Sequence, residues 1–303
     1  GALSAGRKDS DAALFPYYTD DKISDSFETT GSKSIFLVEK NGQTFLWEPF
    51  SLRQASLYKI SQNLYKNAFG NKVIFEEINH DLEIRFTYEW NSTDRYGFVR
   101  KSSLYNTSTS AVKVQFIDGI QNVLPYGIEE ALQNGTSNLV DAYKRTELVE
   151  GSSLAIFALS AIIVDKAEPS EALKSNIAWS IGLENPTILL SSLQLDAFRR
   201  GQEVSQETDI KAEKGAYFLQ SEVALESNGS KEWLLVADVN QTISDVITIK
   251  SQILTNPDLK STILNNVELG SEQLTELVAA SDGLQKTADG LRNIRHFSNT
   301  MFN

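Results

Sequence analysis

The sequence contains no cysteine, only one methionine and only two histidines. A chain without cysteine forms no disulfide, holds no thiolate-bound metal and uses no cysteine nucleophile, whereas its cellular compartment stays open. Its longest apolar run, residues 154–164, is far shorter than the roughly 20 residues that a helix needs to cross a bilayer. The sequence therefore predicts neither a membrane-spanning helix nor a disulfide-stabilised domain.

Basic residues are scarce relative to acidic ones. The 28 lysines and arginines stand against 40 aspartates and glutamates, which gives a net charge of −12. Such a chain repels a phosphate backbone and an anionic lipid surface. We expect neither nucleic acid nor a membrane as a partner.

The chain begins with Gly1 and not with methionine, which indicates that a leader has been removed by processing or by design. Residues 1–11 have the composition of a flexible segment that follows such a cut. Export to the periplasm or the cell exterior is the expectation, and the cytoplasm stays open as an alternative.

Alternating apolar and polar residues dominate the chain up to about residue 240. In residues 81–90, for example, Leu82, Ile84, Phe86, Tyr88 and Trp90 alternate with polar side chains. The same alternation or a short apolar run predicts strands at 35–38, 44–47, 73–78, 98–104, 112–116, 154–164, 177–183, 187–190, 216–225 and 233–237. Strands with one apolar and one polar face are typical of antiparallel sheets, so we predict two large packed antiparallel sheets.

Three segments before residue 240 interrupt the strand pattern. Residues 51–63 and 193–200 predict short helices. Residues 122–141 contain Pro125, Gly127 and Gly135 and are predicted as a long ordered loop with a helical turn at 128–133.

From Thr242 onward the pattern is that of amphipathic helices. Thr242 and Asp245 match a capping box. The apolar residues that follow are assigned to one helix face: Ile243, Val246, Ile247, Ile253 and Leu254. A second helix is predicted from 256 to about Gly270, and a third from 271 onward. Because the apolar pattern continues to the end of the chain, we expect that it packs on a further helical domain.

The polar residues form no complete catalytic constellation. A glycosidase needs two carboxyl groups on either side of a sugar, but Glu76 and Glu77 are neighbours in a predicted strand and point to opposite faces. They are predicted to be solvated surface residues, as are Glu129 and Glu130. His80, near Asp81 and Glu83, is better explained by a polar hairpin tip than by a metal site. Trp90 and Trp179 continue apolar strand faces and are predicted to lie in the core.

Residues 95–104, RYGFVRKSSL, and 114–127, VQFIDGIQNVLPYG, resemble the amino-terminal β-supersandwich of cellobiose-phosphorylase-like carbohydrate-active enzymes. In that family a galactose-mutarotase-like sandwich precedes a helical linker and an α/α toroid. The resemblance implies a mainly β fold with a sandwich at 12–240 and a helical linker at 241–303. It also implies that the catalytic carboxylates lie in the toroid, so that this chain has no catalytic residue, metal or cofactor of its own.

The positive and aromatic side chains of these stretches are unusual in so acidic a chain, which makes them candidates for contacts to carbohydrate. They are Arg95, Tyr96, Arg100, Lys101 and Tyr126. Ion pairs to neighbouring carboxylates are the simpler explanation for the charged ones. Tyr126 lies in the 122–138 segment, and long ordered loops on a rigid sandwich often carry contacts.

The sequence predicts a non-catalytic module of a glycoside phosphorylase or hydrolase. Its expected partners are a carboxy-terminal helical catalytic domain, a carbohydrate, and a second copy bound through the sandwich or the linker. Two alternatives stay open: a free-standing carbohydrate-binding or aldose-epimerase-like domain, and a structural assembly module.

Overall fold

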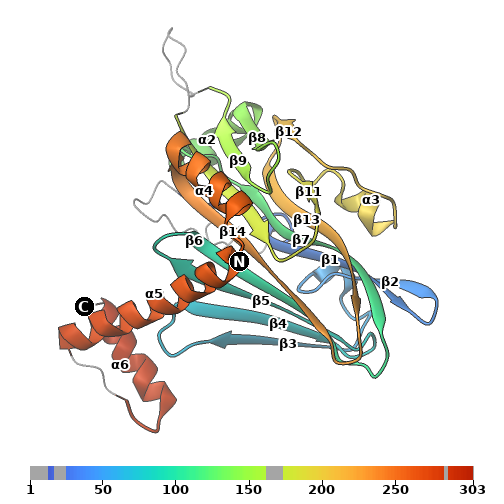
Figure 1. Cartoon of the computed structure of the whole chain (residues 1–303), viewed down its shortest axis with the longest axis horizontal. Coiled ribbons are helices and arrows are strands. Elements are labelled where there is room, and N and C mark those ends of the chain that lie inside the picture. The colour runs from blue at the N-terminus through green and yellow to red at the C-terminus, as the bar shows by residue number, and fades with distance from the viewer. Residues whose placement is uncertain (1–12, 17–24, 162–172, 283–285, 303) are drawn as a thin grey trace.

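Two antiparallel sheets packed face to face form the body of the protein, and helices α4 (Ile243–Thr255), α5 (Leu259–Asp282) and α6 (Gly290–Phe302) follow them (Figure 1). The computed structural model describes residues 13–16, 25–161, 173–282 and 286–302. The predicted flexible segment 1–11 lies outside these residues, as does part of the predicted strand 154–164. The predicted fold class, mainly β with two antiparallel sheets and a helical end, is confirmed.

The sheets contain five and nine strands, and every neighbouring pair is antiparallel. The smaller sheet has the order β11 (Thr187–Leu189), β13 (Gly215–Leu225), β7 (Val112–Val123), β1 (Gly31–Lys40), β2 (Gln43–Trp47). The larger sheet has the order β12 (Asp209–Lys211), β8 (Lys144–Leu148), β9 (Ala155–Leu159), β10 (Lys174–Ile181), β14 (Ser230–Thr242), β6 (Gly97–Asn106), β5 (Ile84–Thr93), β4 (Lys72–Asn79), β3 (Ile60–Lys66).

The core between the sheets is rich in aromatic rings. The ring centroids of Phe36 on β1 and Phe86 on β5 are 4.9 Å apart, and those of Phe116 on β7 and Trp233 on β14 are 4.8 Å apart. These contacts join the two sheets, because each pair takes one ring from each of them. The alternation in residues 81–90 has the predicted result, since the apolar row is buried while Arg85, Thr87 and Glu89 are partly exposed. All four tryptophans are buried, which confirms the prediction for Trp90 and Trp179.

The predicted helix at 51–63 is wrong. Residues Leu52–Gln54 form a single 3-10 turn, η1, and residues Ile60–Lys66 form strand β3. Ile60 and Leu64 are four residues apart, a spacing that fits one face of a helix and also one face of a strand. Pairing with β4 along the whole of β3 decides between the two, and a sequence pattern does not contain that long-range contact.

The predicted loop at 122–141 is also wrong in most of its length. Strand β7 continues to Val123, and helix α2 (Glu130–Tyr143) occupies the second half, with non-helical backbone angles at Thr136. Its Asn-Gly-Thr-Ser sequence has weak helix propensity. Val140 packs with Leu124, Ile128 and Leu159 in a small buried cluster, so burial stabilises a helix that local preference does not favour.

The carboxy-terminal helices differ from the prediction in one boundary. The capping box at Thr242 and Asp245 is confirmed. Helix α5, however, runs through Gly270 without a break. Ile263 and Val267 precede this glycine and Val278 follows it, all buried, and Ser271 accepts a hydrogen bond from Asn71. This packing outweighs the roughly 1 kcal/mol that glycine costs inside a helix.

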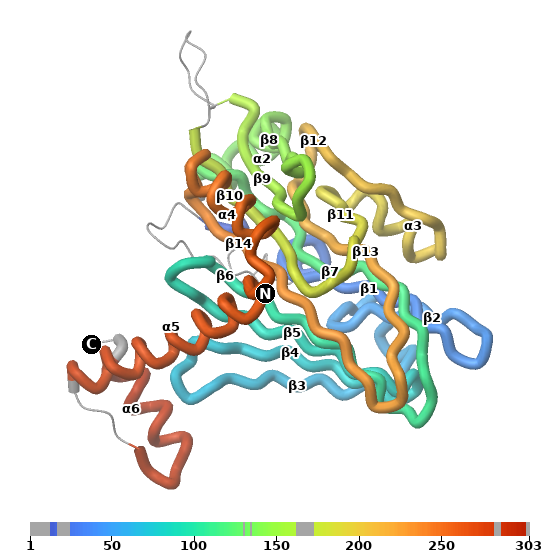
Figure 2. Tube along the Cα trace, viewed as in Figure 1, coloured from blue at the N-terminus to red at the C-terminus, as the bar shows by residue number. Residues whose placement is uncertain are grey.

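Helices α4 and α5 cover part of the outer face of the larger sheet, and α6 turns back beneath α5 (Figures 1 and 2). Val246 of α4 and Leu259 and Ile263 of α5 pack with Tyr96, Trp179 and other residues of β10, β14 and β6 in a second core. Phe297 of α6 packs on Phe69, with the ring centroids 5.1 Å apart. Within the described residues, no helix is both long and apolar enough to cross a membrane.

Two buried tyrosines predict unfolding at alkaline pH. Burial raises the pKa of Tyr88 to about 12 and raises that of Tyr217 well above its ordinary value. In the unfolded chain these phenols ionise near pH 10. Stability is therefore fully present below about pH 10 and is lost as the pH rises through 12, by roughly 3 kcal/mol for Tyr88.

Phenolate absorbance at 295 nm, recorded together with circular dichroism, measures this effect. We expect a subset of the ten tyrosines to ionise only in the pH range in which the fold is lost. Ionisation of all of them near pH 10 with an intact dichroism spectrum would contradict the assignment.

Candidate functional site

Arg100 is a structural residue at the centre of the sandwich. It lies on β6, Asp118 lies on β7, and the side chains of both are 0% exposed. The guanidinium donates to both carboxylate oxygens, with Nη1 to Oδ2 at 2.7 Å and Nη2 to Oδ1 at 2.9 Å. Arg100 was predicted as a carbohydrate contact, but its buried guanidinium offers no surface to a ligand.

Further side chains complete this network. Asp118 accepts hydrogen bonds from Ser34, Ser102 and the indole of Trp233. The Arg100 guanidinium lies 4.5 Å from the ring centroid of Tyr88. Because a buried charge needs a complete set of partners, these contacts fix the two sheets relative to each other. Arg100 and Asp118 come from the two stretches that carry the family resemblance, so those stretches meet in the core.

The other predicted carbohydrate-contact residues do not converge. Tyr96 is buried and packs edge-on against Trp179, while Arg95 beside it is exposed, with its guanidinium 5.4 Å from the Tyr96 ring. Lys101 lies on the outer face of β6, with its Nζ 3.6 Å from Glu232 Oε2. Tyr126 follows β7, and Lys174 Nζ lies 5.2 Å from the centroid of its ring. Among the five predicted carbohydrate-contact residues, Arg95 and Lys101 are the charged ones whose side chains reach solvent.

The carboxylates of Glu76 and Glu77 are buried, which corrects the prediction that they are solvated. They do point to opposite faces of β4. Glu77 is 2% exposed and accepts hydrogen bonds from the indole of Trp47 at 2.8 Å and the backbone N–H of Phe50 at 2.7 Å. Glu76 is 8% exposed and accepts from Asn63 and from Tyr65. Both serve as acceptors for nearby donors, a role that alternation alone does not reveal.

The hairpin tip at His80 holds its polar residues by local contacts. His80 Nε2 lies 2.8 Å from the Ser61 hydroxyl, Asp81 accepts the backbone N–H of Lys59, and Glu83 pairs with Lys40 at 2.7 Å. In the described part of the chain, no group of three or more histidine, aspartate or glutamate side chains has the geometry to hold a metal ion.

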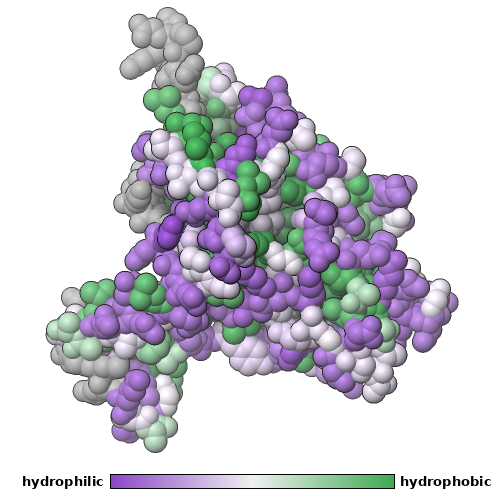
Figure 3. Space-filling model, viewed as in Figure 1, coloured by the Kyte–Doolittle hydropathy of each residue, from purple (hydrophilic) through white to green (hydrophobic). Residues whose placement is uncertain are grey.

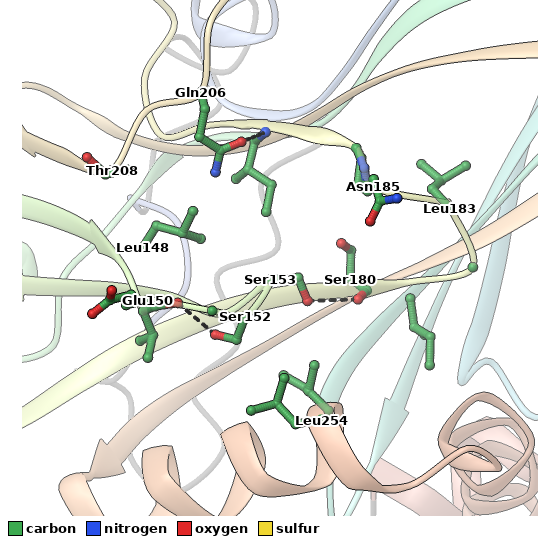
Figure 4. Close-up of a pocket in the computed structure, with 17 residues that line it drawn as sticks. Leu148, Glu150, Ser152, Ser153, Ser180, Leu183, Asn185, Gln206, Thr208 and Leu254 are labelled. Carbon is green, nitrogen blue, oxygen red and sulfur yellow. Dashed lines mark hydrogen bonds between the residues drawn. The ribbon is translucent and has the colours of Figure 1, made fainter.

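An open groove of about 840 Å³ lies at one end of the sandwich. It is formed by the turn that joins β8 to β9, the segment from β10 to β11, residues near 206–208 and the last turn of α4 (Figure 4). Its apolar lining includes Leu148, Leu183, Ile253 and Leu254. Figure 4 shows Leu254 of α4 on one side of Ser153 and Ser180, and Gln206 on the other.

Two polar side chains of the groove, Ser153 and Gln206, bond to backbone groups of its walls. Ser153 Oγ donates to the carbonyl of Ser180 at 3.0 Å, and Gln206 Oε1 accepts the backbone N–H of Ile188 at 2.8 Å. Glu150 is the one carboxylate among the described lining residues. Glycoside hydrolysis commonly uses two facing carboxyl groups, and the described lining contains one.

Helix α4 carries two apolar stripes. Val246, Ile249 and Ile253 pack on the larger sheet. Ile243, Ile247 and Leu254 are 67%, 61% and 56% exposed. At about 100° per residue these three fall within some 40° of one another and so form one outward stripe. The sequence prediction assigned both sets to a single face, which is wrong because the sheet covers only one of them.

The outward stripe has one charged neighbour on its own side of the helix, Lys250, which falls about 20° from Ile243 in projection. In Figure 3, green apolar side chains over α4 lie among white and purple ones, whereas purple side chains dominate the centre of the view. About 80–100° further around the helix, Thr248 and Thr255 are exposed, and their hydroxyls donate to the carbonyls of Ser244 and Ser251 at 2.8 Å. A hydroxyl bonded within its own helix loses little when water is removed, so this face is suited to burial.

The docking face consists of Ile243, Ile247 and Leu254 with the adjoining groove. The sequence analysis named these three residues as apolar but did not separate them from the stripe that the sheet covers. A helical projection of residues 243–255 would have separated the two stripes. The groove has no such signal, because its walls come from segments more than 100 residues apart in the chain.

No family model matches the sequence, and no curated protein matches it. Among solved structures, the chain is similar to a bacterial glucoamylase complexed with acarbose, at 10% identity and a TM-score of 0.47, covering 82% of this chain and 32% of that one. It is also similar to a putative kojibiose phosphorylase from the human microbiome, at 10% identity and a TM-score of 0.39, covering 88% and 28%. A galactose mutarotase-like protein from Clostridium acetobutylicum matches at 8% identity and a TM-score of 0.34, covering 76% and 87%. The chain thus spans about a third or less of the first two enzymes.

Proposed function

We propose that this chain is a non-catalytic sandwich module of a larger carbohydrate-active enzyme, and that its docking face packs on a helical catalytic domain. The observation that carries the proposal is the second apolar stripe of α4. Ile243, Ile247 and Leu254 expose more than half of their surface although the opposite stripe already fixes the helix to the sheet. An outward stripe of this kind gives nothing to the isolated module and suits a helix-on-helix contact.

The three apolar side chains of the stripe can stabilise an interface with another domain when they are buried. Burying an isoleucine or leucine side chain contributes about 1.5–3 kcal/mol, so three of them stabilise a domain interface by several kcal/mol. The stripe itself is apolar, and Lys250, about 20° from Ile243 around the helix, is the charged residue at its border. Its long side chain can keep the ammonium group in water at the rim of the contact while its methylene groups pack on the neighbouring domain. The groove beside Leu254 provides a recess for a side chain of the neighbouring domain.

The carbohydrate-related part of the proposal is supported by the family resemblance of residues 95–104 and 114–127. In the structure these residues hold the sandwich together through Arg100 and Asp118. A module of this kind acts by position: it shapes the rim of the sugar cleft, while the paired carboxylates belong to the helical domain.

The first test measures the catalytic activity of the chain by itself. We expect the 303-residue chain to show no hydrolysis or phosphorolysis of aryl glycosides and disaccharides. Turnover that survives purification and disappears when a residue of this chain is replaced would overturn the proposal.

The second test addresses the docking face. Ile247→Glu is expected to change the stability of the isolated chain by less than about 0.5 kcal/mol, because the side chain is exposed. In the full polypeptide the same change should lower the unfolding midpoint and remove protection of α4 in hydrogen exchange. Leu139→Glu on α2, at a position that is 47% exposed, is the matched control and should leave both unchanged. Equal effects of Ile247→Glu in both proteins would contradict the docking role.

Carbohydrate binding by the chain itself is a second candidate, favoured by the outer face of the larger sheet. On this face Tyr65 is 49% exposed beside the Glu76 carboxylate. Arg85 of β5 lies 3.7 Å from the same carboxylate, and Lys101 lies one strand further away on β6. An exposed ring beside charged hydrogen-bonding groups is the composition of a sugar subsite. Calorimetric titration with mono- and disaccharides tests it, with Tyr65→Ala expected to abolish any heat of binding.

A further inference from the structure

Strand β3 is the outermost strand of the larger sheet. It pairs with β4 on one side, and it forms the lower border of the sheet in Figure 1, where no other element is drawn beside it. Exposed edge strands are normally blunted by charges, prolines or bulges, because they offer free backbone groups to other chains. Among residues Ile60–Lys66 there is one charge, Lys66, no proline, and no register shift against β4.

The hydrogen bonds at the two ends of β3 show which backbone groups face outward. The carbonyl of Lys59 accepts from His80, and the N–H of Asn67 donates to Lys72, so odd-numbered residues point toward β4. Because backbone direction alternates along a strand, the N–H and C=O groups of the even-numbered residues 60, 62, 64 and 66 point away from the sheet. They form a regular row of donors and acceptors along the free edge.

The side chains beside this edge are apolar. Ile60 and Leu64 share the sandwich-facing side of β3 with Gln62, which donates to the buried Glu77. They are nevertheless 41% and 66% exposed. Leu57 in the preceding segment is 63% exposed. These three side chains define an apolar border beside the free edge.

We propose that a second copy of this chain pairs with β3 across a two-fold axis at Asn63, which joins the two larger sheets into one continuous antiparallel sheet. With the axis at residue 63, residue 60 faces 66 and residue 62 faces 64 of the second copy. All four outward residues are then paired. An axis at residue 62 or 64 pairs three of them within the strand, so Asn63 is the favoured centre.

The charges of the strand fit this self-pairing. Lys66 faces Ile60 of the second copy, and Lys59 faces its Asn67, so that no two like charges are directly opposite. The two Leu64 side chains lie on the same face, next to the axis, and cover each other's apolar border. A strand of another protein would need its own complement to this pattern, whereas a second copy supplies it by symmetry.

Asn63 provides a test of the register, because the chain has no cysteine that would compete. Residue 63 faces itself in a non-hydrogen-bonded pair, in which Cα atoms lie about 4.5 Å apart, within the range that a disulfide bridges. Asn63→Cys is therefore expected to give a disulfide-linked dimer in nearly full yield under mild oxidation. Ser61→Cys is the matched control: residue 61 faces 65, so the two introduced thiols lie too far apart and the chain should remain uncrosslinked.

The oligomeric state gives an independent readout. Light scattering after size exclusion should show the 303-residue chain as a dimer, and Leu64→Glu should shift it to a monomer with unchanged circular dichroism. Ile247→Glu on the docking face should leave the dimer intact, so failure of this inference is distinguishable from failure of the proposed function. A monomeric wild-type chain at high micromolar concentration, or equal crosslinking at positions 61 and 63, would overturn the proposal.

Discussion

Asp118→Ala is expected to destabilise the protein by about 3–5 kcal/mol, a large part of the stability of an ordinary domain. The change removes both carboxylate acceptors of the Arg100 guanidinium and the acceptor of the Trp233 indole, all of them buried, and leaves the guanidinium with the hydroxyls of Ser32 and Ser102 as acceptors. A fully buried guanidinium that keeps two hydroxyl partners but loses its counter-ion has no access to water, so the penalty is that of an uncompensated buried charge. The free energy of unfolding in urea, followed by tryptophan fluorescence, measures the effect.

The matched control replaces both partners. Arg100→Met with Asp118→Leu removes the two charges together, and we expect it to be clearly less destabilising than Asp118→Ala, because no buried charge remains. Ser110→Ala, at an exposed position in the loop before β7, should be neutral within about 0.5 kcal/mol. If the double variant were as unstable as Asp118→Ala, lost packing and not an unpaired charge would account for the destabilisation at this site.

Gly119→Ala is expected to cost about 3 kcal/mol or more and to lower the yield of folded protein. Gly119 lies in β7 between β1 and β13, directly opposite Phe218. A Cβ at this position would overlap the carbonyl oxygen of Tyr217 and lie 2.8 Å from Phe218 Cα. Both obstacles belong to the backbone of the central strands, so the sheet would have to separate locally to admit one methyl group.

Gly135→Ala is the matched control, because a Cβ at Gly135 meets no atom within 4 Å. It lies within α2, where alanine has the better helix propensity, so we expect unchanged stability or a gain of up to about 1 kcal/mol. Chemical denaturation and near-ultraviolet dichroism compare the two variants. Equal stability of Gly119→Ala and Gly135→Ala would contradict the close approach of β7 and β13.

The sequence predicted less of the candidate site than it did of the fold. Positive charge in an acidic chain marked Arg100, but charge does not distinguish a surface contact from a buried pair. The partner that decides the matter, Asp118, lies on a strand of the other sheet. The same holds for Glu77, whose donors include Trp47, 30 residues away in the chain. A polar residue in a strand has the same local pattern whether the facing layer supplies donors or water does.

The sequence by itself determined which segments become strands wherever a row of apolar residues alternates with polar ones, as in β5, and where the helices begin, as at Thr242 and Asp245. These features depend on the backbone and on neighbours within a few residues. Tertiary structure alone decided that 60–66 is an edge strand, that α5 continues through Gly270, and that the α4 stripe of Ile243, Ile247 and Leu254 faces outward. Each of these outcomes depends on which distant surface covers a residue. Whether a side chain is buried or exposed is decided only when the layers pack, and local sequence does not contain that contact.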